Sequence, residues 1–106
     1  MTSKSKRELL QLVERKAFDP VMRAKPDGRK EAERKKLERV QKATKAEIER
    51  YRRYGSAQEL VANFKRDLAS PAAKKIHAKL RSLDLPTIED IRDEFERKAS
   101  ELGVAA

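Results

Sequence analysis

The fold is decided by residues 29–55, which read RKEAERKKLERVQKATKAEIERYRRYG. At about 100° per residue, side chains spaced three and four apart fall on one stripe of an α-helix. The spacing predicts a helix over 29–54, which Gly55 is expected to end in the left-handed conformation. The residues of the stripe are Leu37, Val40, Thr44, Ile48 and Tyr51.

This predicted stripe is narrow and is typical of a coiled-coil seam more than of a globular core face. The first two turns, residues 29–36, add almost nothing apolar to it. We therefore expect this end of the helix to project into solvent. We also hypothesise a homodimer, in which a second copy covers apolar surface that one small domain leaves open.

Three shorter helices are predicted after residue 55, at 57–69, 71–83 and 88–102. Each follows residues that favour a helix start, because a hydroxyl or carboxylate can accept from the unpaired N–H groups of the first turn. Pro also suits the first helical position. These start signals are Ser56-Ala57-Gln58-Glu59, Ser70-Pro71 and Thr87-Ile88-Glu89-Asp90.

The N-terminal segment is predicted to form a helix that opens at Ser5, followed by a stop and restart at Asp19-Pro20 and a turn over 25–28. The fold class is therefore all-α, a small helical bundle in a single domain. Its parts are an N-terminal helix and turn segment over 1–28, a long basic helix over 29–55 and a compact three-helix unit over 56–106.

Composition limits the classes of protein. Charged residues make up 42% of the 106, and large apolar residues are few, so a disordered chain is the alternative to a bundle with a modest core. The absence of Cys excludes disulfides and thiolate metal sites. No apolar run approaches the roughly 20 residues of a membrane span, so we expect no membrane association, and no signal peptide is recognisable. A cytoplasmic location is the expectation.

The net charge of +9 belongs wholly to residues 1–55, whereas residues 56–106 are neutral. A Lys or Arg that neutralises a phosphate releases a counterion, so a cationic helix can follow a nucleic-acid backbone. This pattern favours the helix over 29–54 as a phosphate-binding element. Its candidate contact residues are Arg29, Lys30, Arg34, Lys35, Lys36, Arg39, Lys42, Arg52 and Arg53.

The same cations also fit a solvated helix in which Glu and Lys or Arg pair four residues apart. Pairing leaves a positive excess in this half, however, which favours an anionic partner. The pairs in the favourable order are Glu31 with Lys35, Glu38 with Lys42, and Glu49 with Arg53.

Tyr51-Arg52-Arg53-Tyr54 places two aromatic rings beside two guanidinium groups. Unpaired bases can stack on Tyr while Arg holds the phosphates. Tyr51 lies on the apolar stripe, however, so we expect it to be packed, with Tyr54 half-exposed at the helix end.

The helices 57–69 and 71–83 could also be read as a helix-turn-helix. The turn would be only Ser70-Pro71 and lacks Gly, so the signal is weak. In this interpretation the second helix presents Lys74, Lys75, His77, Lys79 and Arg81 to a groove.

No catalytic residue, metal site or cofactor site is predicted. His77 is the only His, is expected to be partly exposed, and has no nucleophile or carboxylate assigned to it by any motif. The acids near 89–94 are explained by the favourable position of negative charge at a helix start, and they could dock on the basic helix. No glycine-rich phosphate loop is present.

We therefore expect a small binding protein rather than an enzyme. The first interpretation is low-specificity binding of DNA or RNA through the basic helix. The alternative is a helical protein–protein interaction module, an adaptor or inhibitor, whose basic helix meets an acidic protein partner.

Overall fold

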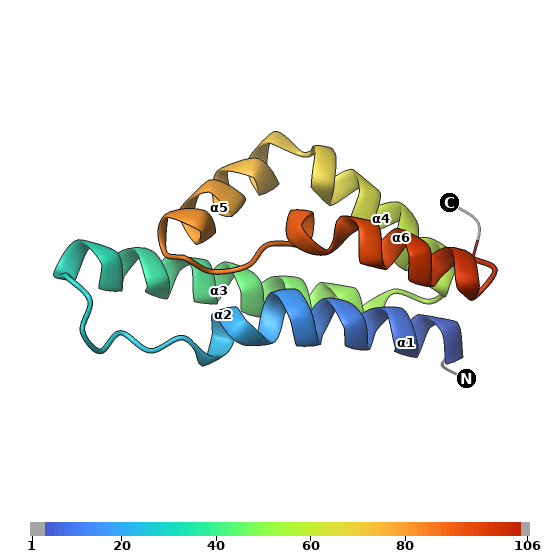
Figure 1. Ribbon diagram of the computed structural model, residues 1–106, viewed down its shortest axis with the longest axis horizontal. Helices are drawn as coiled ribbons and strands as arrows, with labels where there is room; N and C mark the ends of the chain where they lie inside the picture. Colours follow the sequence, from blue (N-terminus) through green and yellow to red (C-terminus); the bar gives the residue numbers. More distant parts are fainter. Residues whose placement is uncertain (1–3, 105–106) are drawn as a thin grey trace.

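A long helix, α3 (Glu31–Arg53), runs along much of the length of the molecule (Figure 1). The computed structural model describes residues 4–104, contains no strand among them and measures 45 × 25 × 19 Å. The all-α helical bundle predicted from the sequence is confirmed. The remaining elements are α1 (Lys4–Val13), the π-helix η1 (Glu14–Phe18), α2 (Asp19–Arg23), α4 (Ala57–Ala69), α5 (Pro71–Ser82), the 3₁₀-helix η2 (Ile88–Ile91) and α6 (Arg92–Glu101).

The main apolar core joins the two halves of the chain. Leu9 and Val13 of α1 are fully buried, and α1 contacts both α4 and α6. Phe64 of α4 stacks on Phe95 of α6, with ring centroids 3.8 Å apart. The N-terminal helix is therefore part of the core and not only an arm beside it.

A second apolar cluster lies beneath the N-terminal half of α3. Helices α2 and α5 both contact α3 there, which covers its stripe from two sides. The chain itself thus buries the narrow stripe that motivated the homodimer hypothesis. The buried members of this cluster are Val21, Leu37, Val40, Leu80 and Leu83.

The stop predicted at Asp19-Pro20 is wrong, because α1, η1 and α2 form one continuous helical path over 4–23. Pro20 has no N–H to donate, and its ring crowds the carbonyl one turn earlier. The chain accommodates Pro20 by widening the preceding turn into η1, where the Asp19 N–H donates to the Glu14 carbonyl five residues back. A local π-turn therefore replaces the predicted break.

The predicted helix starts in the second half are confirmed, and α4 has the predicted bounds. Ser56 Oγ accepts from the Glu59 N–H at 3.1 Å, and Ser70 Oγ accepts from Ala73. Thr87 and Asp90 form a reciprocal capping box. The last helix, predicted over 88–102, begins with a 3₁₀-helical turn, η2, and ends at Glu101.

Two predicted helix ends are wrong. Lys4 and Ser5 already belong to α1, so Ser5 is not its cap. Gly55 does not adopt a positive φ. Instead, α3 ends as Tyr54 becomes extended, and Lys6 Nζ donates to the Arg52 carbonyl at 2.9 Å, which satisfies one terminal acceptor.

Candidate functional site

The side of α3 that faces away from its buried stripe carries four exposed cations, Lys35, Arg39, Lys42 and Arg53, which we call the outer face of α3. Their steps of four, three and eleven residues keep them on one side of a straight helix. The side chains of Arg39, Lys42 and Arg53 make no ion pair or hydrogen bond with any other residue of the described part of the chain. Their charges are therefore directed into solvent.

Only one of the three predicted Glu–cation pairs on this helix forms. Lys35 Nζ lies 3.8 Å from Glu31 Oε1. Glu38 and Glu49 are exposed, and neither forms an ion pair with Lys42 or Arg53 among residues 4–104. The charges of Lys42 and Arg53 are consequently not neutralised by an ion pair with a described residue. The carboxylates of Glu38 and Glu49 lie beside the outer face of α3 without pairing with these two cations.

Two other predicted phosphate-contact residues, Arg29 and Lys36, connect the start of α3 with the end of α5 through hydrogen bonds. Arg29 is only 23% exposed, and its Nη2 donates to the Leu83 carbonyl at 3.3 Å. Lys36 Nζ donates to Ser82 Oγ at 3.0 Å. These side chains already have structural partners, so they are less available to a ligand than the outer face.

Lys30 and Arg34 lie at the same end of the helix. Lys30 is exposed at the N-cap position of α3. Arg34 is exposed too, and its Nε donates to the Arg29 carbonyl at 3.0 Å. Both cations remain accessible, beside the turn that joins α2 to α3 rather than on the outer face.

Arg52 lies on the side of α3 that faces η1. Its guanidinium forms a forked ion pair with Glu14, with Nε–Oε1 and Nη2–Oε1 distances of 3.0 Å. The hydrogen bond and the charge of Glu14 raise the pKa of Arg52. The structure thus separates Arg52, which holds two elements together, from its neighbour Arg53.

Both tyrosines of the Tyr51–Tyr54 motif are buried. Tyr51 is packed as predicted, and its ring meets Phe18 edge-on at 5.4 Å. The prediction that Tyr54 is half-exposed is wrong, because its ring lies against Tyr51 and is 8% exposed. All five aromatic side chains of the protein are buried, so none offers a stacking surface.

Beneath this region lies a polar network that sequence reasoning missed. The Asp67 carboxylate, 5% exposed, accepts from Tyr51 Oη at 2.7 Å and from Arg50 Nη2 at 2.8 Å. Glu47 lies 3.7 Å from the same guanidinium. Burial, followed by repulsion from Asp67, raises the pKa of Glu47 to about 7. The only sign of this network in the sequence was the position of Asp67, a charged residue on the inner face of α4.

His77 is buried at 6% exposure, contrary to the partly exposed position predicted for it. Residues 84–91 fold back along α5 and bring Glu89 Oε1 to 3.4 Å from His77 Nδ1 and 2.9 Å from Arg81 Nη1. Burial lowers the pKa of His77 against the opposing effect of Glu89. Of the five residues of the helix-turn-helix interpretation, His77 is therefore buried, and Arg81 is paired with a carboxylate at the surface.

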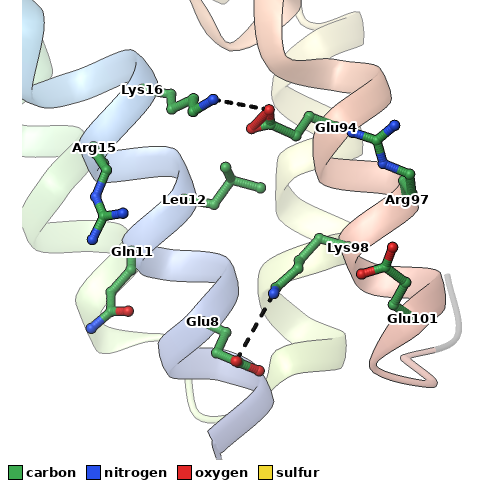
Figure 2. Close-up of a pocket in the computed structure, with 9 residues that line it drawn as sticks. All are labelled: Glu8, Gln11, Leu12, Arg15, Lys16, Glu94, Arg97, Lys98 and Glu101. Carbon is green, nitrogen blue, oxygen red and sulfur yellow. Dashed lines mark hydrogen bonds and ion pairs between the residues drawn. The ribbon is translucent and has the colours of Figure 1, made fainter.

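The acids of the C-terminal segment meet cations of α1 and α5 instead of the basic helix. In a groove of about 390 Å³ between α1 and α6, Leu12 lies between two ion pairs, Lys16–Glu94 at 3.0 Å and Lys98–Glu8 at 3.9 Å (Figure 2). Four of the seven charged side chains that line the groove are thus paired across it, whereas Arg15, Arg97 and Glu101 form no ion pair with the described residues. No group of His, Asp and Glu side chains in the described residues is arranged to bind a metal ion.

The chain matches no protein-family model, no curated protein and no solved structure. Among residues 4–104, no helix is both long and apolar enough to cross a membrane.

Proposed function

We propose that this protein binds nucleic acid through the phosphate backbone, with little sequence preference, and that the outer face of α3 is the contact surface. The observation that carries the proposal is the exposure of Arg39, Lys42 and Arg53 without internal partners. They belong to a chain with a net charge of +9. Cations in this state gain most from a polyanion, because they give up no internal ion pair to bind it.

The burial of the aromatic residues favours a duplex over a single strand. Proteins that hold single strands without sequence preference stack bases on exposed aromatic rings. Tyr51 and Tyr54 are both buried, so this contribution is missing. A duplex offers a denser line of phosphates, and the salt dependence of its binding is correspondingly steeper.

The test measures the affinity of the protein for labelled duplex DNA, duplex RNA and the matching single strands over a series of salt concentrations. We expect binding that weakens steeply with salt, with duplexes bound more tightly. In the variant Arg39→Gln/Lys42→Gln, the slope of log K against log salt should fall by about one for each cation removed.

The matched control is Lys65→Gln/Arg97→Gln, which removes one Lys and one Arg from exposed positions on α4 and α6. It should retain most of the affinity and the slope. Equal losses in the two double variants would remove the outer face as the site. Absence of binding by the wild-type protein to every probe at low salt would refute nucleic-acid binding itself.

An acidic protein partner would use the same cations, so the experiment must separate the two. A partner recovered from a pull-down with the wild-type protein, retained after nuclease treatment and lost with Arg39→Gln/Lys42→Gln, would favour the protein–protein alternative. The proposal expects the recovered material to be nuclease-sensitive.

A further inference from the structure

We infer that the phosphate-binding surface extends from α3 onto α5, through Lys75 and Lys79, so that two neighbouring helices contact the same duplex. The inference rests on the proposed function, and it adds a second row of cations that the basic stretch 29–55 does not contain. Lys75 is exposed and Lys79 is half-buried. Neither forms an ion pair or hydrogen bond through its side chain with another described residue.

The register of α5 on α3 places these lysines beside the basic helix. Leu80 and Leu83 share a buried cluster with Leu37 and Val40, so the end of α5 lies over the beginning of α3 (Figure 1). Arg29 Nη2 donates to the Leu83 carbonyl at the same junction. The two helices run in roughly opposite directions, and α5 diverges from α3 toward its own first turns (Figure 1).

A chain of hydrogen bonds identifies the side of α5 that adjoins the cations of α3. Lys36 Nζ donates to Ser82 Oγ at 3.0 Å, and Ser82 Oγ donates to the Lys79 carbonyl at 2.7 Å. Lys75, Lys79 and Ser82 are four and three residues apart and so share one side of α5. That side is the one that Lys36 reaches.

On α3, Arg39 is three residues after Lys36 and connects this region with the outer face. Ala43 lies between Arg39 and Glu47 in helical steps of four, and its side chain is small and uncharged. The result is a surface with one row of cations on α3 and a second row on α5. Packed helices have axes about 8–10 Å apart, so the two rows stay separate and can contact different phosphates.

The side of α5 that lies about 100° further around the helix has a different character. Arg81 there is paired with Glu89 at 2.9 Å and with Asp90 at 3.6 Å. Lys74 is seven residues before Arg81 and lies on that same side, exposed. On α5, Arg81 is thus paired with carboxylates of η2, whereas Lys75 and Lys79 have no carboxylate partner among the described residues. This asymmetry supplies an internal control for the inference.

The test compares Lys75→Gln/Lys79→Gln with Lys65→Gln/Lys74→Gln, two variants that each remove two lysine charges. Binding of labelled duplex DNA is measured as a function of salt, and thermal unfolding verifies that both variants fold. Each phosphate contact multiplies affinity roughly eightfold at 0.1 M salt relative to 1 M. We expect Lys75→Gln/Lys79→Gln to lose about tenfold or more in affinity at 0.1 M salt and the control about threefold or less.

The outcomes separate the inference from the function on which it rests. If the wild-type protein binds and the two double variants lose affinity equally, Lys75 and Lys79 do not form a second row of the binding surface, although the outer face of α3 can still bind. If the wild-type protein does not bind duplex DNA at low salt, the proposed function fails first. A selective loss in Lys75→Gln/Lys79→Gln, with a salt slope lower by about two, supports the two-helix surface.

Discussion

The phenolic hydroxyl of Tyr51 donates a 2.7 Å hydrogen bond to the carboxylate of Asp67 in the interior of the bundle. Three residues later, just past the end of α3, the hydroxyl of Tyr54 is buried too, but it has no hydrogen-bond partner among residues 4–104. The two tyrosines thus differ in what their hydroxyls contribute, although their rings lie in one cluster with centroids 5.2 Å apart.

Replacing each tyrosine with Phe should therefore have opposite consequences. Tyr51→Phe removes a bond to a charged acceptor and leaves Asp67 with one donor fewer, which should lower the free energy of unfolding by about 1.5–3 kcal/mol. Tyr54→Phe removes an unpaired buried hydroxyl and should leave stability unchanged or raise it. Urea unfolding of the two variants checks the difference, and equal destabilisation would contradict it.

The stability of the protein should fall as the pH rises toward 7 because of Glu47. Burial and the nearby Asp67 raise the pKa of Glu47 from 4.5 to about 7, so between these values the folded state binds a proton that the unfolded state releases. One such group changes the free energy of unfolding by at most about 1.4 kcal/mol per pH unit. Glu47→Gln should flatten this dependence and be more stable than the wild type above pH 7.

His77 acts in the opposite direction and needs its own variant. Its pKa is lowered from 6.5 by burial, so the folded state binds fewer protons than the unfolded state and stability drops as the pH falls below 6.5. Unfolding of the wild type, Glu47→Gln and His77→Gln from pH 5 to pH 8 separates the two slopes. A wild-type slope that Glu47→Gln leaves unchanged would show that Glu47 is ionised normally.

The capping box at Thr87 is predicted to stabilise the start of the last helical segment. Thr87 is 1% exposed, its Oγ1 accepts from the Glu89 N–H, and its own N–H donates to Asp90 at 2.8 Å. Thr87→Val keeps the volume but loses the acceptor, and should cost about 1 kcal/mol. Thr87→Ser keeps the acceptor and serves as the control in thermal unfolding. A loss in Thr87→Val no larger than that in Thr87→Ser would mean that the hydroxyl acceptor contributes little to stability.

Local signals predicted most of the fold. Helix α4 occupies the predicted 57–69, because its capping residues and apolar spacing act within the segment itself. The errors arise where contacts with distant parts of the chain determine the local structure. Tyr54 is buried by contacts with the bundle core, and Gly55 is not left-handed because α3 ends in an extended Tyr54. Spacing along one helix carries no information about such contacts.

The same reason explains why the candidate site could be predicted only in part. The cationic character of α3 was evident from its composition, but the partners of its cations were not. Arg29 bonds to Leu83, 54 residues away, and Arg52 bonds to Glu14, 38 residues away. A count of charges cannot distinguish Arg29 and Arg52 from Arg39. In the folded protein, Arg29 and Arg52 hold helical elements together, whereas the Arg39 side chain has no partner among the described residues.

The neighbours Arg52 and Arg53 provide the sharpest test of that division. Arg53 is exposed on the outer face of α3, whereas Arg52 is held by both carboxylate oxygens of Glu14, which is 13% exposed. Arg53→Gln should weaken duplex binding and lower the salt slope by about one, with little change in stability. Arg52→Gln should lower the thermal unfolding temperature by leaving Glu14 unpaired, with a smaller effect on binding.

Glu14→Gln completes this comparison. It frees Arg52 from its ion pair without removing the cation, so duplex affinity should be maintained or increase while stability falls. Suppose that Arg52→Gln and Arg53→Gln lose affinity equally and that neither loses stability. This result would mean that Glu14 does not hold Arg52 in solution. The distinction between cations that stabilise the fold and cations that bind phosphate would then be wrong. It requires that internal ion pairs such as Arg52–Glu14 persist when phosphate competes for the same guanidinium group.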